Sequence, residues 1–588
     1  MLLQVVALVA LVALASAGFE HNLYNYAGTP PVPLSDMNGM ARFWIGQAWF
    51  QVYWSALVTV LAVAAHLLWR RGTSTALRPR LAALPRRLRG GAAVLGGAGL
   101  LVWLGSGAII FYNTNLLNRY QTAPERDAAL ADVERALLPF ESLPLPRITA
   151  VTLDVQFYPR QARAVTTGRY QLENRGTVAI EQLHIHWPER LTIDQLVLDG
   201  AVLEKQYPRF AYRIYRLQPA MQPGEVRELR FVTTLEERGF TNGARLHGLV
   251  ANGSFVDNSE ITPSLGMSRD GLLTDRAKRR KYGLPPDVRP PKLEDEAGRA
   301  RNEFSAASDW VHADITMGTD ADQTPIAPGY QWWGHQLLPS HQQGATLLVE
   351  SLAQYSALLV MERLYGKEQM RRFLKYELDR YLRQRGSEAM EELPLARVEN
   401  QQYIHYQKGS LAMYWLKEVV GEAAVNRALA RLLKAHAFKS APYPNALDFL
   451  RLMREEVGPA HDALITDLFE KITLLDVKAS NASAVKLADG RWQVSFDVVA
   501  AKRYADGQGQ QTDAPLAEPF DIGVFSAEPG KPGYNAASVL LFDRQRIKTG
   551  TQRLPVVVAQ QPAFVGVDPY NKRIDRNADD NLVRVEKP

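Results

Sequence analysis

Residues 331–360 read "QWWGHQLLPSHQQGATLLVESLAQYSALLV", and this stretch says most about the fold. From Gly344 onward apolar residues recur every three or four positions until a glycine at 366, which predicts an amphipathic helix. The helix carries an acid, Glu350, in its first half. An aromatic tetrapeptide, Gln331–Gly334, stands before it.

Further helical patterns follow this one along the chain. They lie at 367–386, 404–421, 422–438 and 445–458. After about residue 475 the period changes to two, and an Asp489-Gly490 turn predicts a hairpin within 483–499. The sequence therefore predicts an α-helical region at 331–475 and a smaller C-terminal β domain at 476–588.

The region before residue 331 has strand periodicity. Val151, Leu153, Val155 and Phe157 alternate with polar residues, as on a half-buried strand. Similar segments lie near 164–174, 178–188, 191–198 and 225–236. We therefore expect an antiparallel β domain at 148–270, preceded by a linker helix within 119–147 and followed by a proline- and charge-rich connecting region at 271–330.

Residues 1–118 are predicted to contain transmembrane helices. Segments 43–69 and 90–118 have 27 and 29 residues without Asp, Glu, Lys or Arg, more than the roughly 20 that span a bilayer. Segment 1–19 is also uncharged, and it lacks the basic start of a signal peptide, which favours a third span. The positive-inside rule makes the arginine-rich loop 70–89 cytoplasmic and the part after 118 extracytoplasmic. This predicts a multi-pass protein of an inner (plasma) membrane with a large periplasmic domain.

Composition limits the possible functions. The 588 residues include no cysteine, which excludes disulfides, cysteine nucleophiles and thiolate metal sites. The net charge of +6 comes from one short loop, where seven arginines between 70 and 89 have no acid among them. A topology signal explains this loop better than nucleic acid or anionic lipid does, so no nucleic-acid partner is predicted.

Several motifs resemble the membrane alanyl aminopeptidase family of gluzincin metallopeptidases. In that family the zinc motif H-E-x-x-H is followed directly by Gln-Trp-Trp-Gly, as at 331–334 here. A helix with the third zinc ligand comes next, and Glu350 matches that position. A Tyr-x-Lys-Gly motif follows, and Tyr406-Gln407-Lys408-Gly409 matches it. The resemblance implies that Glu350 is a Zn²⁺ ligand and that Tyr406 stabilises the oxyanion. The resemblance is greatest to bacterial members of the family that are fused to the permease region of an ABC-type exporter.

The chain departs from this family at the zinc motif itself. The two histidines and the base should stand at 330, 326 and 327, but the residues are Tyr330, Ile326 and Ala327. The family's Gly-x-Met-Glu-Asn motif is also missing, and "ARVEN" at 396–400 lies after the third-ligand helix. We therefore expect that the first half of the catalytic domain is absent and that Zn²⁺ is not bound tightly, because zinc sites use three or more protein ligands.

Other residues are only weak candidates to replace the missing zinc ligands or to bind a substrate or metal. His335, His341 and His405 lie near Glu350 or Tyr406 in sequence, but structural histidines are the commoner case. Glu260 is a weak candidate for binding a substrate amine. Asp575, Asn577 and Asp579 alternate like a calcium loop but lack its glycine and distal glutamate, which favours a solvated turn.

The predicted fold is a multidomain membrane protein. N-terminal transmembrane helices are followed by an all-β domain, a partial thermolysin-like helical domain and a small β domain. The sequence predicts a membrane-anchored protein of the zinc aminopeptidase family. That family hydrolyses peptides at their N-termini, but we expect this chain to be inactive because the H-E-x-x-H motif is absent. One alternative is a non-catalytic accessory or binding module that associates with ABC transporter subunits. Another is a defective gene product without function.

Overall fold

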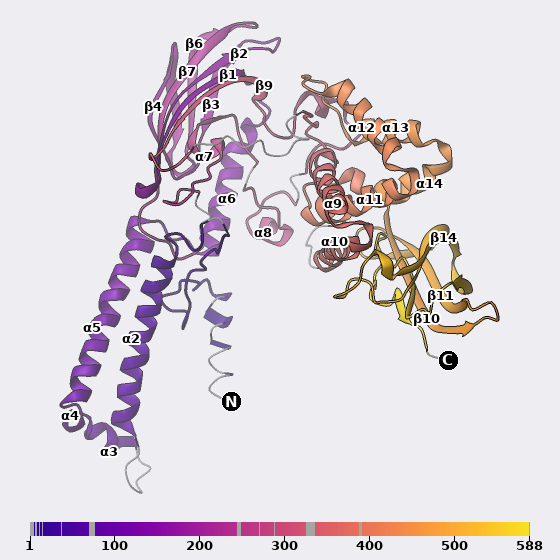
Figure 1. Ribbon diagram of the computed structural model, residues 1–588. Coiled ribbons are helices and arrows are strands. Elements are labelled where there is room, and N and C mark those ends of the chain that lie inside the picture. Colours follow the sequence, from indigo (N-terminus) through magenta and orange to yellow (C-terminus); the bar gives the residue numbers. More distant parts are fainter. Residues whose placement is uncertain are drawn as a thin grey trace. The chain divides into compact units, whose positions relative to one another are not determined.

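The computed structural model describes residues 5, 9–10, 12–14, 16–36, 38–69, 77–243, 248–269, 271–286, 289–324, 336–386 and 391–586. The chain forms two compact units (Figure 1). Unit 1 comprises Met1–Leu284 and Val311–Ile326, and unit 2 comprises Pro285–Trp310 and Ala327–Pro588. The motif-bearing stretch 325–335, which includes His335, lies outside the described residues.

Two helices of unit 1 are long and apolar enough to cross a membrane. They are α2 (Trp44–Leu68) and α5 (Gly91–Phe111), and the second continues as a π-helical turn, η1 (Tyr112–Leu117). The helices pack side by side (Figure 1), and many of their apolar side chains are exposed on the surface of the pair. Both coincide with predicted spans. Nine of the nineteen residues of segment 1–19 lie outside the described residues, so the third predicted span stays a prediction.

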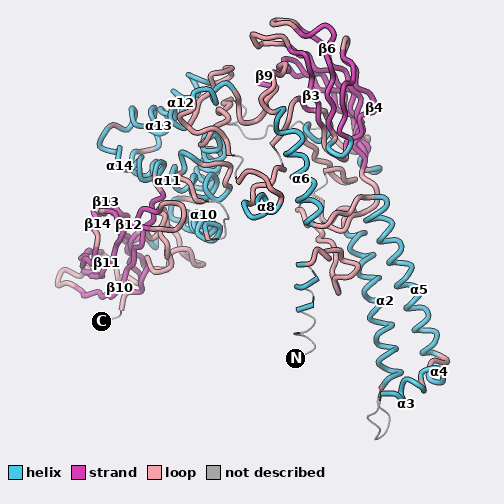
Figure 2. The backbone as a smooth tube through the Cα atoms, turned by 180° about the vertical axis from the view of Figure 1, so that it is seen from behind, coloured by secondary structure: helices cyan, strands magenta, loops and turns pink. Residues whose placement is uncertain are grey.

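The β part of unit 1 stands at one end of this helix pair. Its strands form two antiparallel sheets, with orders β4-β7-β2-β1-β9 and β5-β6-β3-β8, seen as the larger magenta group in Figure 2. The strands are β1 (Arg147–Tyr158), β2 (Arg163–Glu173), β3 (Ile180–His186), β4 (Leu191–Leu198), β5 (Ala201–Tyr207), β6 (Tyr212–Met221), β7 (Val226–Glu236), β8 (Ser264–Leu265) and β9 (Ser308–Gly318). The predicted antiparallel strands near 151–157, 164–174, 178–188, 191–198 and 225–236 are confirmed.

Strand β9 was not expected from the sequence. It occupies the edge of the five-stranded sheet beside β1, inside the segment predicted to be a connecting region. Six consecutive residues of β9, from Val311 to Thr316, are exposed on both faces. Val311, Ala313, Ile315 and Met317 do alternate with His312, Asp314 and Thr316, but the charge, proline and glycine content of the surrounding segment favoured a connecting region.

A buried ion pair joins two short elements beside the sheets. Helix α6 (Ala123–Leu137) begins with a Thr122 and Glu125 capping box, which confirms the predicted linker helix. Its Glu134 accepts two hydrogen bonds from the Arg279 guanidinium of α8 (Arg276–Lys281), at 2.6 and 2.8 Å. Both side chains are buried, so the bidentate geometry satisfies charges that would otherwise be costly.

The helices of unit 2 enclose one large apolar core. They are α9 (Leu352–Tyr365), α10 (Met370–Arg385), α11 (Gly409–Val420), α12 (Glu422–His436), α13 (Ala446–Val457) and the short α14 (Asp462–Ile465). Leu348, Leu352, Tyr381 and Leu416 are among its buried members. The predicted helical series is confirmed. Two of the helices are preceded directly by π-helical turns, η6 (Leu347–Ser351) and η9 (Tyr403–Lys408).

The C-terminal strands of unit 2 form two four-stranded sheets. One has the order β10-β11-β12 with β15 on β11, and the other is β14-β13-β16-β17. The strands are β10 (Ile472–Lys486), β11 (Trp492–Ala505), β12 (Gln511–Ala514), β13 (Ala517–Phe525), β14 (Val539–Lys548), β15 (Gly550–Val558), β16 (Phe564–Val567) and β17 (Leu582–Arg584). Strands β10 and β11 pair up to Lys486 and Trp492, and Gly490 takes a positive φ of 86°, which confirms the predicted hairpin.

The segment 575–581 departs from the solvated turn expected of it. Asp575 is only 1% exposed, although Asn577 and Asp579 are exposed. Its Oδ1 accepts the backbone N–H groups of Val477 and Asn577, at 3.4 and 3.2 Å. The prediction of a wholly solvated turn was wrong because it weighed only neighbouring residues, whereas β10, about a hundred positions earlier, covers this loop.

Candidate functional site

The two residues that the family resemblance singled out lie on neighbouring helical turns of unit 2. Glu350 belongs to η6 and Tyr406 to η9, and both side chains are partly buried. The turns are joined directly, because the Ser351 hydroxyl donates to the His405 carbonyl at 2.6 Å. Single π-helical turns within α-helices frequently occur at functional sites. Each candidate residue is therefore held by an irregular but well-packed stretch of backbone.

Gly409 explains why these turns approach so closely. A Cβ atom at this position would lie 2.2 Å from Ser351 Oγ and 2.7 Å from Ser351 Cβ. No side chain fits in that space, so the glycine that ends the Tyr-x-Lys-Gly motif has a packing role in this chain. It brings the turn that bears Tyr406 against the turn that bears Glu350.

His405 lies inside this junction as a neutral hydrogen-bonding group. Its Nδ1 is 3.1 Å from Thr346 Oγ1, and its ring meets the Tyr406 ring edge-on at 4.5 Å between centroids. Burial lowers the pKa of His405 to about 4, so the ring is uncharged at neutral pH. It fits a structural role better than that of a metal ligand.

A buried ionic cluster connects η9 to the neighbouring helix α10. Lys408, 1% exposed, has its Nζ 3.5 Å from Glu392 Oε1. Glu392 also accepts hydrogen bonds from the Tyr381 hydroxyl and the Arg385 guanidinium, both on α10. Burial, followed by the Glu392 charge, raises the pKa of Tyr381 well above its ordinary value, so the phenol stays a donor. The lysine of the motif thus anchors η9 to α10.

The remaining sequence candidates lie elsewhere. His341 Nδ1 is 2.7 Å from Glu303 Oε2, in a hydrogen bond that links two loops of unit 2. Glu260 belongs to unit 1, on the short helix α7 (Asn258–Ile261). There it accepts the Asp257 backbone N–H in a capping box at 3.2 Å and forms an ion pair with Arg190. These contacts account for Glu260 without a substrate.

Zinc does not fit the residues described here. Across the described part of the chain, no group of three His, Asp or Glu side chains is placed to hold a metal ion. No H-E-x-x-H occurs anywhere in the 588 residues. At the spacing before Glu350 that a gluzincin site requires, the sequence has no histidine, and a single carboxylate cannot hold zinc tightly. No hydrolytic step can be derived through a metal here.

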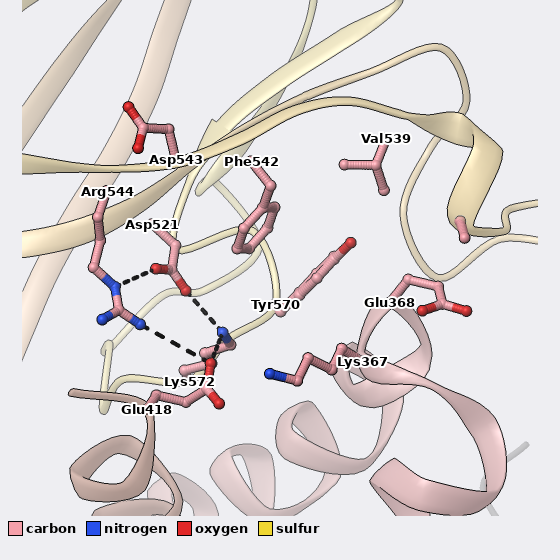
Figure 3. A pocket seen from close by; sticks show the side chains of 11 residues that line it. Lys367, Glu368, Glu418, Asp521, Val539, Phe542, Asp543, Arg544, Tyr570 and Lys572 are labelled. Atoms are coloured by element: carbon pink, nitrogen blue, oxygen red, sulfur yellow. Dashed lines mark hydrogen bonds and ion pairs between the residues drawn. The ribbon is translucent and has the colours of Figure 1, made fainter. Parts of the chain in front are cut away.

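One cavity of unit 2 lies where its helices meet the C-terminal strands, and its volume is about 510 Å³ (Figure 3). Phe542 and Tyr570 stack beside each other within it, with ring centroids 4.8 Å apart. The charged side chains that line it are Lys367, Glu368, Glu418, Asp521, Asp543, Arg544 and Lys572. Sequence reasoning missed this site, because its residues come from five separate segments and form no motif.

A chain of ion pairs forms one wall of the cavity. Lys572 lies between Glu418 and Asp521, with its Nζ at 2.5 and 2.9 Å from their oxygens (Figure 3). Arg544 Nε is 2.9 Å from the other Asp521 oxygen. Burial would raise the pKa of Glu418, but the charges of Lys572 and Lys417 outweigh it and lower the pKa to about 2. Burial would lower the pKa of Lys572, but the charges of Asp521 and Glu418 raise it, so Lys572 and Glu418 are both charged at neutral pH.

Comparisons with known proteins give limited results. No protein-family model matches the chain, and no curated protein does. A Legionella pneumophila aminopeptidase A crystallised with aspartic acid aligns over 77% of this chain and 61% of its own, at 10% identity and a TM-score of 0.34. A mutant M1 zinc metallopeptidase from Deinococcus radiodurans, bound to a Tyr-Ser-Ala substrate, aligns over 57% of this chain and 97% of its own, at 14% identity and a TM-score of 0.32.

These two likenesses are too low to assign the chain a fold or an activity. The chain also spans only 61% of the length of the Legionella enzyme.

Proposed function

We propose that this chain is a membrane-anchored relative of the zinc aminopeptidases that does not hydrolyse peptides. The observation that carries the proposal lies in the sequence around residue 330. Gln-Trp-Trp-Gly, Glu350 and Tyr-Gln-Lys-Gly are all present, but Ile326, Ala327 and Tyr330 occupy the positions of the two zinc histidines and the base. The packing of η6 against η9 supports it, since Lys408 and Gly409 of the surviving motif have structural contacts of their own.

Activity and metal content test this proposal together. The full chain, purified in detergent with added zinc chloride, should release no p-nitroaniline from alanyl-p-nitroanilide above the rate of a buffer blank. Mass spectrometry of the dialysed protein should find well below one zinc per chain. Zinc-dependent hydrolysis that Glu350→Ala abolishes and Glu362→Gln retains would refute the proposal, because Glu362 is bonded to Lys417 and Tyr414 outside the η6–η9 junction.

We further propose that α2 and α5 anchor the chain in a plasma membrane, with the arginine-rich connection on the cytoplasmic side and the part after residue 118 outside. The outward-facing apolar side chains of the two helices support this. The chain has no cysteine, so single cysteines report topology cleanly. In intact cells a membrane-impermeant maleimide should label Asp513→Cys, and should label Ala82→Cys only after permeabilisation. The reverse pattern would contradict this topology.

A second candidate function is ligand binding at the cavity beside Lys572. The observation that favours it is an open space of about 510 Å³ that presents an aromatic pair together with charged groups of both signs. Such a site suits a small zwitterion, such as a short peptide. Isothermal titration of the full chain with dipeptides should give heat that Phe542→Ala removes and the exposed control Phe438→Ala does not. Equal heats for both variants would exclude the cavity as the binding site.

A further inference from the structure

The connection between α2 and α5 carries an uncompensated positive charge. It contains the short helices α3 (Leu77–Ala82) and α4 (Leu84–Arg87), at the end of the helix pair remote from the sheets of unit 1 (Figure 1). No Asp or Glu occurs between Asp36 and Glu125, so the connection has no nearby acid in sequence. The described arginines of the connection are Arg78, Arg80, Arg86, Arg87 and Arg89.

Two of these arginines have a structural role at the end of α2. Arg87 donates to the carbonyl of Leu67 at 2.8 Å, and Arg80 reaches the carbonyl of Leu68 at 3.4 Å. Both carbonyls belong to the last turn of α2, where backbone acceptors lack partners within the helix. Arg80 and Arg87 therefore complete the end of α2 and are partly buried.

The other three arginines point to a different role. Arg78, Arg86 and Arg89 are exposed, and within the described ranges none of them forms an ion pair. Leu81 and Leu88, next to them, are 46% and 48% exposed. A short segment that exposes leucines and arginines together is typical of a membrane interface, where the apolar side chains enter the acyl boundary and the cations meet the headgroups.

The position of the connection agrees with that environment. Helix α2 has 25 residues and is therefore about 37 Å long, somewhat more than the roughly 30 Å hydrocarbon core. If α2 and α5 cross a bilayer, the connection emerges at the depth of the headgroups. A soluble polyanion would have to displace the lipid already present there.

We propose that this connection binds anionic phospholipid headgroups, with Arg78, Arg86 and Arg89 as the contacting residues. The inference rests on the proposed anchoring through α2 and α5 and adds to it a lipid preference. A guanidinium offers a planar pair of donors that matches a phosphate. Each basic residue near an anionic membrane surface changes the apparent affinity about fivefold.

Energy transfer to labelled lipids measures this preference. Ala82→Cys introduces a unique site for a donor fluorophore on the connection, because the chain has no native cysteine. The full labelled chain is reconstituted in phosphatidylcholine vesicles that contain the same small fraction of acyl-chain-labelled phosphatidylglycerol or phosphatidylcholine. We expect higher transfer to phosphatidylglycerol, and 0.5 M salt should reduce the difference because it screens exposed charges.

Charge variants assign the effect to residues. R78Q/R86Q/R89Q should abolish the preference, whereas the three corresponding Arg→Lys changes should keep most of it, since charge remains. A control with the same net charge, R169Q/R175Q/R209Q, removes exposed arginines from the β part of unit 1 and should leave the preference unchanged.

Three results would overturn the inference. Equal transfer to both lipids, or an unchanged preference in R78Q/R86Q/R89Q, would refute it while leaving the anchoring intact. A DNA duplex that binds the connection and removes the lipid preference would make it a nucleic-acid surface instead. Failure of the chain to float with neutral vesicles would refute the anchoring itself, and with it this inference.

Discussion

Gly409 shows how one residue determines the geometry of the candidate site. The Cβ of an alanine there would overlap Ser351, and Ser351 cannot move away easily because its hydroxyl is bonded to the His405 carbonyl. In a fully buried junction such overpacking costs about 1–3 kcal/mol. The motif glycine is therefore explained by packing, without reference to catalysis.

Gly409→Ala should loosen the junction of η6 and η9. We expect faster amide hydrogen exchange in peptides that cover 347–365 and 403–420, because the cost of overpacking lowers the free energy of opening there. Gly386→Ala is the matched control, since its Cβ would meet only the Arg383 carbonyl at 3.8 Å. Unchanged exchange in Gly409→Ala would show that the backbone relaxes without cost and that the glycine is dispensable.

The contribution of Asp575 to folding stability changes with pH in the opposite direction from that of an ordinary ion-paired carboxylate. Burial raises its pKa from 3.8 to about 7, so the folded chain binds the proton more tightly than the unfolded chain. Its contribution to stability is therefore complete below about pH 4 and is lost as the pH rises through 7. Three pKa units correspond to roughly 4 kcal/mol as an upper limit.

Asp575→Asn should remove this dependence. The amide oxygen can still accept the N–H groups of Val477 and Asn577, and no charge is buried at high pH. The thermal midpoint of the variant, measured relative to that of the wild type, should therefore be higher at pH 8 than at pH 5. Asp579→Asn, on the exposed part of the same loop, should show no such change. A difference that is the same at both pH values would refute the raised pKa.

At the scale of elements, periodicity predicted most of the helices and strands but few of the contacts that position the site. The patterns at 344–366 and 404–421 were sufficient to place Glu350 and Tyr406 on helices. They could not show the π-helical turns, because each is a single irregular turn and is too short to have a periodicity of its own. The support of Lys408 by Glu392, Tyr381 and Arg385 depends on tertiary packing between separate segments, which no local pattern reveals.

The ion pair between α6 and α8 provides a test at this scale. Arg279→Met leaves Glu134 buried without its partner, and breaking a buried pair in this way costs about 3–5 kcal/mol. Since α8 has the sequence RAKRRK, its loosening should appear as faster tryptic cleavage within 276–281.

The second substitution Glu134→Gln should reverse much of that effect, because it removes the uncompensated charge. Arg175→Met, which breaks an exposed pair with Glu173, should leave tryptic cleavage at α8 at the wild-type rate. Cleavage in Arg279→Met at the wild-type rate would show that the pair does not hold α8 in place.

At the scale of the whole molecule, the sequence divides into parts that support different conclusions. The apolar helices α2 and α5 favour a bilayer from composition alone, while the motifs at 331–334, 350 and 406–409 favour the proposed relationship to zinc aminopeptidases. Neither implies an activity. The chemistry of that family needs several metal ligands at one point in space, and the residues at 326, 327 and 330 are isoleucine, alanine and tyrosine where the zinc motif has two histidines and a glutamate.

The membrane assignment can be tested by one charge at the middle of α5. Leu101 is the eleventh of its 21 residues and is 73% exposed. On the surface of a water-soluble helix, Leu101→Arg would be tolerated within about half a kcal/mol. In a bilayer an arginine at the helix centre costs about 2.5–3.5 kcal/mol, and this cost should lower the fraction of chains that resist carbonate extraction from membranes. Leu101→Ile should behave as the wild type. Equal extraction of Leu101→Arg and wild type would mean that α5 does not face lipid at this position, and the outward apolar side chains of α2 and α5 would then require a protein partner to cover them.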